Sequence, residues 1–319
     1  MRRGAEVLVD VCAGVRTGEQ VVIVTDDLLL PIAEAVATVA SDRGGVATIV
    51  NAPPRTIDNE EPAEAVGAAM CGADVVFLPV THALSHTRAA REAIGAGARV
   101  VSMSAFTERM MQSGGLFADF AARRPLCDAL AQRLTDTSAV RVTNPAGTDL
   151  TFSLKGRSGN SHPCIVDAPG FTAVPNIEAN TSPLEGTPNG TLVVDGSIPY
   201  YGIGVIDEPV RFQIHEGFVR SIDGGSQAVA LRDLLAAQDD RWVYNVAQFA
   251  IGLNPQCTEF TGEMLNDEGV NGTIHIGIGT SSNLGGTVQA KTHFDAIIRA
   301  PSVWLDDDLV IRDGEVLAT

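Results

Sequence analysis

The sequence predicts a mixed α/β fold in two parts: a doubly wound domain on a parallel sheet, then a mostly antiparallel α+β domain. Up to about residue 135, nearly continuous apolar strands alternate with helical stretches. Such strands are typical of parallel sheets that are covered on both faces. From residue 136 onward, short strands are separated by Asn-Pro, Asp-Gly and Glu-Gly turns, which favours antiparallel pairing. We therefore expect an α/β domain over 1–135 and a strand-rich domain over 136–319.

The elements of the first domain follow from its apolar runs and breakers. Strands are expected at 19–27, 46–52, 74–80 and 99–105, and helices at 28–45, 61–73 and 81–98. Gly-Gly closes the first of these helices. A further helix at 121–139 is expected to connect the two domains.

The second domain is expected to be built mainly from strands. They are predicted within 140–157, 190–199, 209–222, 272–279 and 291–317, with one helix at 226–238. Hydrophobic residues make up 45% of the chain and aromatic residues only 5%, so the core is expected to be mostly aliphatic.

Composition excludes several classes of partner. The net charge of -17 disfavours binding to nucleic acids and to anionic membranes. No apolar run has the length of a membrane span, and the N-terminus shows no signal-peptide pattern, so a cytoplasmic protein is expected. The five cysteines form no CxxC pair, which argues against a disulfide framework or a cysteine zinc site.

A short strand near the C-terminus carries an unusual pair of side chains. His293 and Asp295 lie two residues apart among apolar neighbours, so they share one face of the strand. His275 lies in a second apolar strand, edged by glycines. Two imidazoles and a carboxylate are a common ligand set for zinc, iron(II) or manganese. The alternative is a buried His–Asp pair with a structural role.

Two other stretches supply candidate residues. Glu178 and Glu185 lie in a segment rich in Pro, Asn and Gly, and either is a candidate metal ligand or catalytic base. In the helix expected at 81–98, His82 and His86 are four residues apart and share a face. We expect His86 or Arg88 to contact a substrate carboxylate.

Several stretches together resemble one enzyme family over nearly the whole chain. They include "NIEANTSPLEGTPNGTLVVDGS", "VAQFAIGLNP", "DEGVNGTIHIGIG" and "THFDAII". This set resembles the aminopeptidase T-like metallopeptidases, which bind two catalytic metals through two glutamates, two histidines and an aspartate, with a tyrosine alongside. The resemblance implies a homo-oligomer, at least a dimer, and a metal-binding second domain. It also implies four ligands, namely Glu178, His275, His293 and Asp295.

Two positions depart from the pattern of that family. Gln248 stands where the second glutamate belongs, and Ser282 stands where the tyrosine belongs. A neutral amide contributes no charge to a site that must hold two dications. Gln248 is thus a lost ligand or a residue behind the ligands, and Ser282 is expected to contact the substrate. One divalent metal (zinc, manganese, cobalt or iron) is expected.

The resemblance extends to two relatives that use one metal. These are the iron(II) enzymes of the 2,5-dihydroxypyridine 5,6-dioxygenase type, with a histidine at the place of Gln248 and none at that of His275, and 5-nitroanthranilate aminohydrolase. The first expectation is a metal-dependent hydrolase of a small amide or aromatic molecule, with Glu185 or Glu178 taking the proton of a metal-bound water. The alternatives are an iron(II) ring-cleaving dioxygenase, an aminopeptidase with an altered second metal site, and a non-catalytic binding protein.

Overall fold

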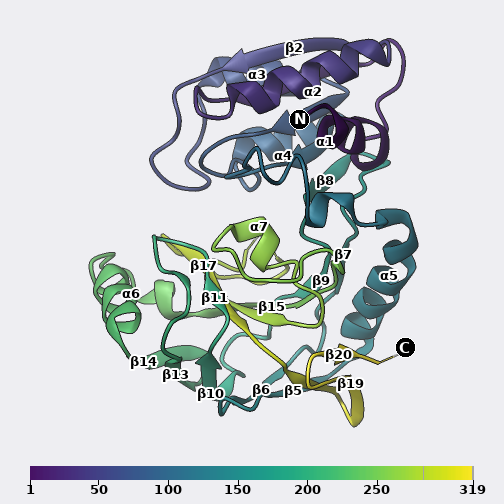
Figure 1. The fold of residues 1–319 in the computed structure, drawn as a ribbon. Helices are drawn as coiled ribbons and strands as arrows, with labels where there is room; N and C mark the ends of the chain where they lie inside the picture. Colours follow the sequence, from purple (N-terminus) through teal and green to yellow (C-terminus); the bar gives the residue numbers. More distant parts are fainter. Residues whose placement is uncertain (283, 318–319) are drawn as a thin grey trace. The chain divides into compact units, whose positions relative to one another are not determined.

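The computed structural model describes residues 1–282 and 284–317, which form two compact units (Figure 1). The first unit comprises Met1–Ala121 and Pro163–Pro175, and the second comprises Ala122–His162 and Asn176–Thr319. The chain therefore passes between the units three times, and neither unit begins or ends at residue 135. The predicted fold class, a parallel-sheet domain plus a mostly antiparallel one, is confirmed.

The first unit contains a five-stranded parallel sheet in the order β2-β1-β3-β4-β8. Its strands are β1 (Gln20–Thr25), β2 (Val46–Asn51), β3 (Val75–Leu78), β4 (Arg99–Ser102) and β8 (Gly170–Ala173). The first four agree with the predicted strands. The fifth is supplied by the returning segment 163–175, whose short Gly-Phe-Thr-Ala stretch shows no long apolar run.

Helices flank this sheet because its strands are apolar on both faces. They are α1 (Arg2–Glu6), a π-helical turn η1 (Val7–Cys12), α2 (Leu30–Asp42), α3 (Glu64–Cys71), α4 (Arg88–Gly95) and the short 3₁₀ turn η2 (Gly115–Phe117). Figure 1 shows α2 beside β2, and α2 packs on both β1 and β2. Alternate side chains of the strands, such as Val22, Val76 and Val100, instead form one core with α3 and α4.

The helix predicted at 81–98 is too long at its N-terminal end. Helix α4 begins at Arg88, because the Thr87 hydroxyl caps it by accepting a hydrogen bond from the Ala90 N–H. His82 and His86 therefore precede the helix, and the prediction that they share a helical face is wrong.

The second unit contains two antiparallel sheets. The eight-stranded sheet has the order β14-β13-β10-β6-β5-β18-β19-β20, and the seven-stranded sheet has the order β12-β11-β17-β16-β15-β9-β7. The strands of the first are β5 (Ala139–Thr143), β6 (Asp149–Ser153), β10 (Asn189–Val194), β13 (Val210–His215), β14 (Phe218–Asp223), β18 (Ser302–Leu305), β19 (Asp308–Arg312) and β20 (Glu315–Val316). Those of the second are β7 (Asn160–His162), β9 (Glu178–Thr181), β11 (Ser197–Ile198), β12 (Gly204–Val205), β15 (Val246–Gly252), β16 (Ile274–Gly279) and β17 (His293–Ile298). The helices of this unit are α5 (Phe120–Asp136, whose first two residues belong to the first unit), α6 (Ser226–Ala236), η3 (Arg241–Tyr244) and α7 (Met264–Asp267).

The seven-stranded sheet separates apolar from polar side chains by strand alternation. In β16 the residues Ile274, Ile276 and Ile278 point to one face, and His275 points to the other. The apolar face meets the eight-stranded sheet, since the rings of Phe152 and Phe249 lie 5.3 Å apart between centroids. The opposite face is left to the polar residues.

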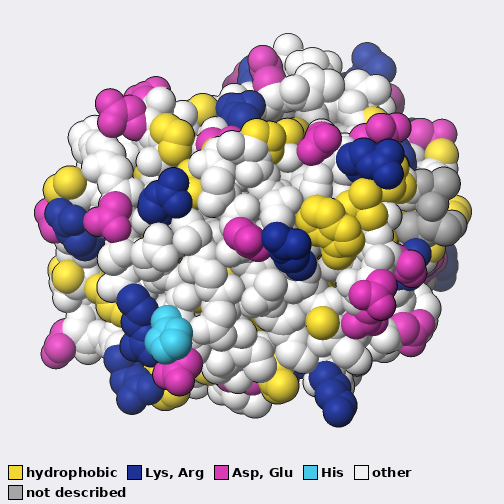
Figure 2. Space-filling view, turned by 90° about the horizontal axis from the view of Figure 1, so that it is seen from below, with side chains coloured by type: hydrophobic (Ala, Val, Ile, Leu, Met, Phe, Trp, Pro, Cys, Tyr) yellow, Lys and Arg dark blue, Asp and Glu magenta, His cyan; other side chains and the backbone are white. Residues whose placement is uncertain are grey.

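Three further features of the described residues concern the surface, the helices and the cysteines. On the face drawn in Figure 2, acidic and basic side chains are interspersed rather than gathered by sign. Within residues 1–282 and 284–317, no helix is long and apolar enough to cross a bilayer. None of the five cysteines, all of which lie in the described residues, forms a disulfide bond.

Candidate metal centre

Three strands bring the four predicted ligands to the polar face of the seven-stranded sheet: the neighbours β16 and β17, and β9, which β15 separates from β16. His275 comes from β16, His293 and Asp295 come from β17, and Glu178 comes from β9. His275 Nε2 lies 3.2 Å from Glu178 Oε2 and 3.9 Å from Asp295 Oδ1. Asp295 Oδ1 also lies 3.6 Å from His293 Nε2. The four side chains therefore meet around the ring nitrogens of the two histidines.

Gln248 lies beside this group, on the strand between β9 and β16. Its Nε2 is 3.3 Å from His275 Nε2, and it pairs across the strands with Gly277. The amide thus occupies a position next to the ligands, where it adds no charge.

Gly277 explains why glycine is needed in β16. A Cβ atom at this position would lie 2.6 Å from the Cβ of Gln248, 2.9 Å from Cε1 of His293 and 3.1 Å from Oδ1 of Asp295. The missing side chain therefore makes room for three side chains of the site, rather than for an approaching ligand.

Asparagines hold Glu178 in place. Asn180 Nδ2 donates to Glu178 Oε1 at 2.5 Å, and Asn160 donates in turn to Asn180 at 2.9 Å. Asn176 Nδ2 lies 3.0 Å from Glu178 Oε2. Burial alone would raise the pKa of Glu178, but the hydrogen bond and charge of His275, with His162 and Asn180, hold it below its usual value. The carboxylate is therefore ionised and restrained.

Two residues of the site were not predicted from the sequence, Tyr200 and Glu268. The Tyr200 hydroxyl lies 2.7 Å from Glu268 Oε1 and 2.9 Å from Asp295 Oδ2. Burial, and next the charge of Asp295, raise the pKa of Glu268 well above its usual value. Its only sequence signal was a glutamate just before the "GVNGTIHIGIG" stretch.

His162 was also missed. It lies directly across from Glu178 in the pairing of β7 with β9, so the two side chains share a face. Burial lowers the pKa of His162, while the charge of Glu178 opposes this effect. The alternation of polar residues in "NIEAN" and "NSH" was the available signal.

The two histidines are strongly influenced by the carboxylates. Burial alone would lower the pKa of His275, but Asp295, Glu178 and Glu268 raise it to about 9. Burial lowers the pKa of His293, but the charge and hydrogen bond of Asp295 raise it above its usual value. Burial would raise the pKa of Asp295, but the charges of both histidines lower it strongly.

The geometry of His293 suits a metal ligand. Its Nδ1 lies 2.8 Å from the Thr280 carbonyl oxygen, which can only accept a hydrogen bond. Nδ1 therefore carries a proton, and Nε2 is directed towards Asp295 Oδ1. A backbone carbonyl behind one ring nitrogen is a usual support for a metal-binding histidine.

The donor set fits one divalent metal. As the side chains stand, no group of three or more His, Cys, Asp or Glu residues in the described ranges is arranged to hold a metal ion. One of these donors, Asp295 Oδ1, is buried and has no hydrogen-bond partner among the described atoms. His275, His293, Asp295 and Glu178 could hold an ion such as iron(II), manganese or zinc.

Glu185 and Ser282 are placed differently from these four. Glu185 forms an ion pair with Arg157 and accepts hydrogen bonds from the Thr287 N–H at 2.7 Å and hydroxyl at 2.9 Å. Burial raises its pKa, but these partners lower it below the usual value, which makes it a weak base. Ser282 is exposed, and its N–H donates to the Val288 carbonyl.

His86 and Arg88 lie in the first unit. The His86 ring is 5.8 Å from that of Phe171, between centroids. The Arg88 side chain is exposed and lies 3.3 Å from Glu92. Their expected contact with a substrate stays a prediction.

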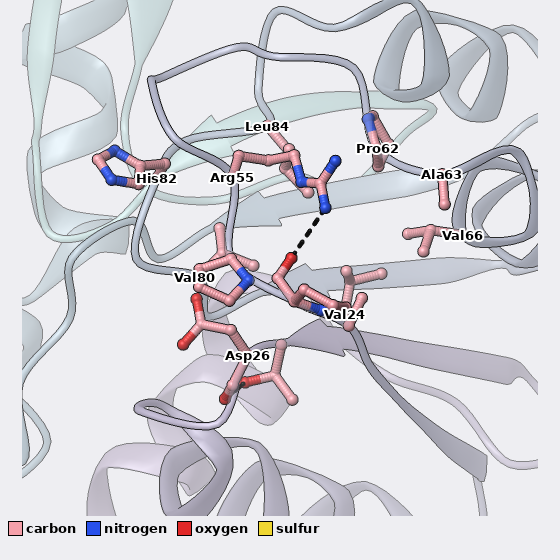
Figure 3. A pocket seen from close by; sticks show the side chains of 13 residues that line it. Val24, Asp26, Arg55, Pro62, Ala63, Val66, Val80, His82 and Leu84 are labelled. Carbon is pink, nitrogen blue, oxygen red and sulfur yellow. Dashed lines mark hydrogen bonds between the residues drawn. The ribbon is translucent and has the colours of Figure 1, made fainter.

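A pocket in the first unit lies at the carboxyl ends of β1, β2 and β3 (Figure 3). Its space is about 20 Å³, room for a single water molecule. Arg55 reaches over it and donates to the Pro53 carbonyl at 3.1 Å. The Asp26 carboxylate accepts from the N–H groups of Thr81 and Leu28. Backbone groups thus already engage the polar atoms at this edge.

Comparison with known proteins adds to this geometry. A family model described as 2,5-dihydroxypyridine 5,6-dioxygenase matches residues 7–318. The chain belongs to this family. It is a family of enzymes named for an oxygenase, so the comparison supports the dioxygenase alternative better than the hydrolase that the sequence analysis placed first.

Individual relatives agree. 2,5-Dihydroxypyridine 5,6-dioxygenase of Pseudomonas putida is 28% identical over 196 residues, which are 58% of this chain and 56% of that enzyme. The match thus spans little more than half of the length of that relative.

Solved structures show the same fold. The structure of the dioxygenase from Pseudomonas putida superimposes with a TM-score of 0.86 at 23% identity, covering 99% of this chain and 97% of that one. AmpT from Thermus thermophilus gives a TM-score of 0.74 at 16% identity, covering 99% and 98%. The resemblance to aminopeptidase T-like proteins is therefore a resemblance of fold.

Proposed function

We propose that this chain is an iron(II)-dependent dioxygenase that opens the ring of a small hydroxylated aromatic molecule of the dihydroxypyridine kind. The observation that carries the proposal is the group of buried His275 and Asp295 with half-buried His293, beside Glu178, in a chain of this family. Two histidines and a carboxylate with open positions are the donor set of many non-haem iron oxygenases.

The charges of the site favour a single metal. The pKa values of Glu178 and Asp295 are lowered, so their two negative charges would balance one dication, while burial and the charge of Asp295 raise the pKa of Glu268. Gln248 offers an amide where a second ion would need a carboxylate. This balance argues against an aminopeptidase with two metals.

The residues of the chain have distinct parts in this proposal. When bound, iron(II) supplies the one-electron chemistry that O₂ requires. His275 and His293 present ring nitrogens, and Asn176 and Asn180 hold Glu178 in one orientation. Glu178, His275 and Asp295 are buried, so their surroundings would limit the access of bulk water to the bound metal.

Oxygen labelling tests the proposal. Protein loaded with iron(II) without air is given 2,5-dihydroxypyridine and ¹⁸O₂. We expect one O₂ consumed per ring opened, and both labelled atoms in the product. Turnover at an unchanged rate without oxygen would contradict the proposal.

A single-metal hydrolase is the second candidate, and Glu268 is the observation that favours it. This carboxyl, whose pKa is raised by burial and by Asp295, lies next to the candidate ligands, where it could deliver a proton to a leaving group. Glu185 is not suited to such a part because of its ion pair with Arg157. Hydrolysis of an amide or aromatic amine would proceed without air and take one oxygen atom from H₂¹⁸O.

A further inference from the structure

The segment between β11 and β12 presents two adjacent tyrosines to different partners. Tyr200 directs its hydroxyl to Glu268 and Asp295. Tyr201 is 39% exposed, and its hydroxyl donates to the backbone carbonyl of His293 at 3.1 Å. The hydroxyl of Tyr200 therefore contacts carboxyl groups of the site, whereas that of Tyr201 contacts a backbone carbonyl, so the two residues can be compared by the same substitution.

The two oxygens of Asp295 have different surroundings. Oδ2 accepts a hydrogen bond from Tyr200 at 2.9 Å. Oδ1 is buried, has no hydrogen-bond partner among the described atoms, and lies 3.6 Å from His293 Nε2. The contact with Tyr200 thus restrains the carboxylate so that its other oxygen is turned towards the histidines.

The contacts of Tyr200 continue to Glu178. Tyr200 lies 2.7 Å from Glu268 Oε1, and Asn176 Nδ2 lies 3.0 Å from Glu268 Oε2. The same Asn176 nitrogen lies 3.0 Å from Glu178 Oε2. Hydrogen bonds therefore join Asp295 to Glu178, the two carboxylates proposed as ligands, in one continuous arc.

We propose that Tyr200 is a positioning residue of the metal centre. Through this arc, which includes Glu268 and Asn176, its hydroxyl sets the orientation of Asp295 and its spacing from Glu178. The inference rests on the proposed metal site, but it does not depend on which reaction the metal supports. Supporting groups of this kind orient ligands, and their loss commonly weakens metal binding.

The test compares Tyr200→Phe with Tyr201→Phe, since each removes one hydroxyl and keeps the ring. Equilibrium dialysis with iron(II), and with cobalt(II) as a spectroscopic probe, measures the affinity in the absence of substrate. We expect Tyr200→Phe to weaken binding by about 10- to 100-fold and to change the visible cobalt(II) spectrum. Tyr201→Phe should change neither by more than about twofold.

A second variant separates positioning from folding. Glu268→Gln keeps an NH2 group that can donate to the Tyr200 oxygen and an oxygen that can accept from Asn176, so it should weaken binding less than Tyr200→Phe does. Thermal unfolding shows whether each variant is folded. Equal affinities and spectra for the Tyr200→Phe and unaltered proteins would overturn the inference, as would failure of the unaltered chain to bind either metal. If metal binds and responds to Tyr200→Phe but no oxygen-dependent turnover is found, the inference stands and the proposed function fails.

Discussion

The carboxyl edge of the parallel sheet and the polar face of the seven-stranded sheet both collect acidic side chains, but they use them differently. At the first, Asp26 accepts hydrogen bonds from the backbone N–H groups of Thr81 and Leu28. At the second, Glu178 and Asp295 are engaged by other side chains. A carboxylate bound to backbone groups holds loops together, whereas one bound to side chains can exchange a partner for a ligand.

The largest effect is expected from His293→Ala, which removes one of the candidate ligands on the polar face of the seven-stranded sheet. It removes a ring nitrogen that no other side chain replaces, so metal binding should fall by more than about 100-fold and turnover should be lost. Metal content after dialysis measures this. The control is His215→Ala, at the exposed end of β13, which should bind metal like the unaltered chain. Full activity in His293→Ala would show that the candidate site is not the active site.

Gly277→Ala tests how closely the side chains on this face are packed. The added Cβ would lie 2.6 Å from the Cβ of Gln248, so the protein should lose about 1–3 kcal/mol of unfolding free energy, and metal affinity should fall as well. Gly95→Ala, where a Cβ meets nothing within 4 Å at the end of α4, should stabilise by up to about 1 kcal/mol. Denaturant unfolding compares the two. Equal unfolding free energies for the Gly277→Ala and Gly95→Ala variants would mean that the side chains around Gly277 can move apart to make room for a methyl group.

Glu185→Gln and Glu178→Gln compare two glutamates that lie seven residues apart in the sequence. Glu185→Gln removes the charge that pairs with Arg157, so stability should fall by about 1 kcal/mol while metal affinity stays within about twofold. For Glu178→Gln, by contrast, the main expected effect is a strong loss of metal affinity. Titration with cobalt(II) and chemical denaturation separate the two outcomes. Loss of metal from the Glu185→Gln variant would indicate that Glu185 takes part in metal binding after all.

The smallest effect is expected from Glu19 in the first unit. Its carboxylate receives two hydrogen bonds from Arg99, at 2.8 and 3.2 Å. Burial raises the pKa of Glu19, but Arg99 and the Arg16 N–H lower it below the usual 4.5. Because the pKa is lower when folded, the stabilisation is complete above about pH 5 and is lost as the pH falls through the folded value.

The Glu19→Gln variant should therefore be less stable than the unaltered chain at pH 7, by ~1 kcal/mol or less, with the gap closing in acid. Unfolding curves from pH 7 down to pH 3 measure this gap. A gap that widens in acid would contradict the assigned direction of the shift.

Much of the fold was predictable because it depends on local pattern. The apolar runs between residues 19 and 105 predicted four parallel strands, and alternation predicted that His293 and Asp295 share a face. Helix ends were less predictable, since α4 starts where Thr87 caps it. Strand β8 has only four residues and joins the sheet from a distant segment.

The candidate site was predictable only where its residues lie on strands. Tyr200 and Glu268 follow or precede short elements, and their meeting with Asp295 depends on how loops are placed. Glu178 and Glu185 looked equivalent in sequence, because no local pattern shows that Arg157 lies beside only the second. Contacts between segments far apart in the chain decided both cases.

The seven-stranded sheet also has a consequence for how the protein comes into being. The candidate ligands are spread over β9, β16 and β17, from Glu178 to Asp295, so no short segment contains them all. Closing such long loops costs entropy, and pairing of distant strands is slow. A chain emerging from the ribosome thus cannot assemble the proposed metal site until β17 has paired. Acquisition of the metal would then be among the last events of maturation, and a metal that binds only the finished sheet would stabilise it by mass action.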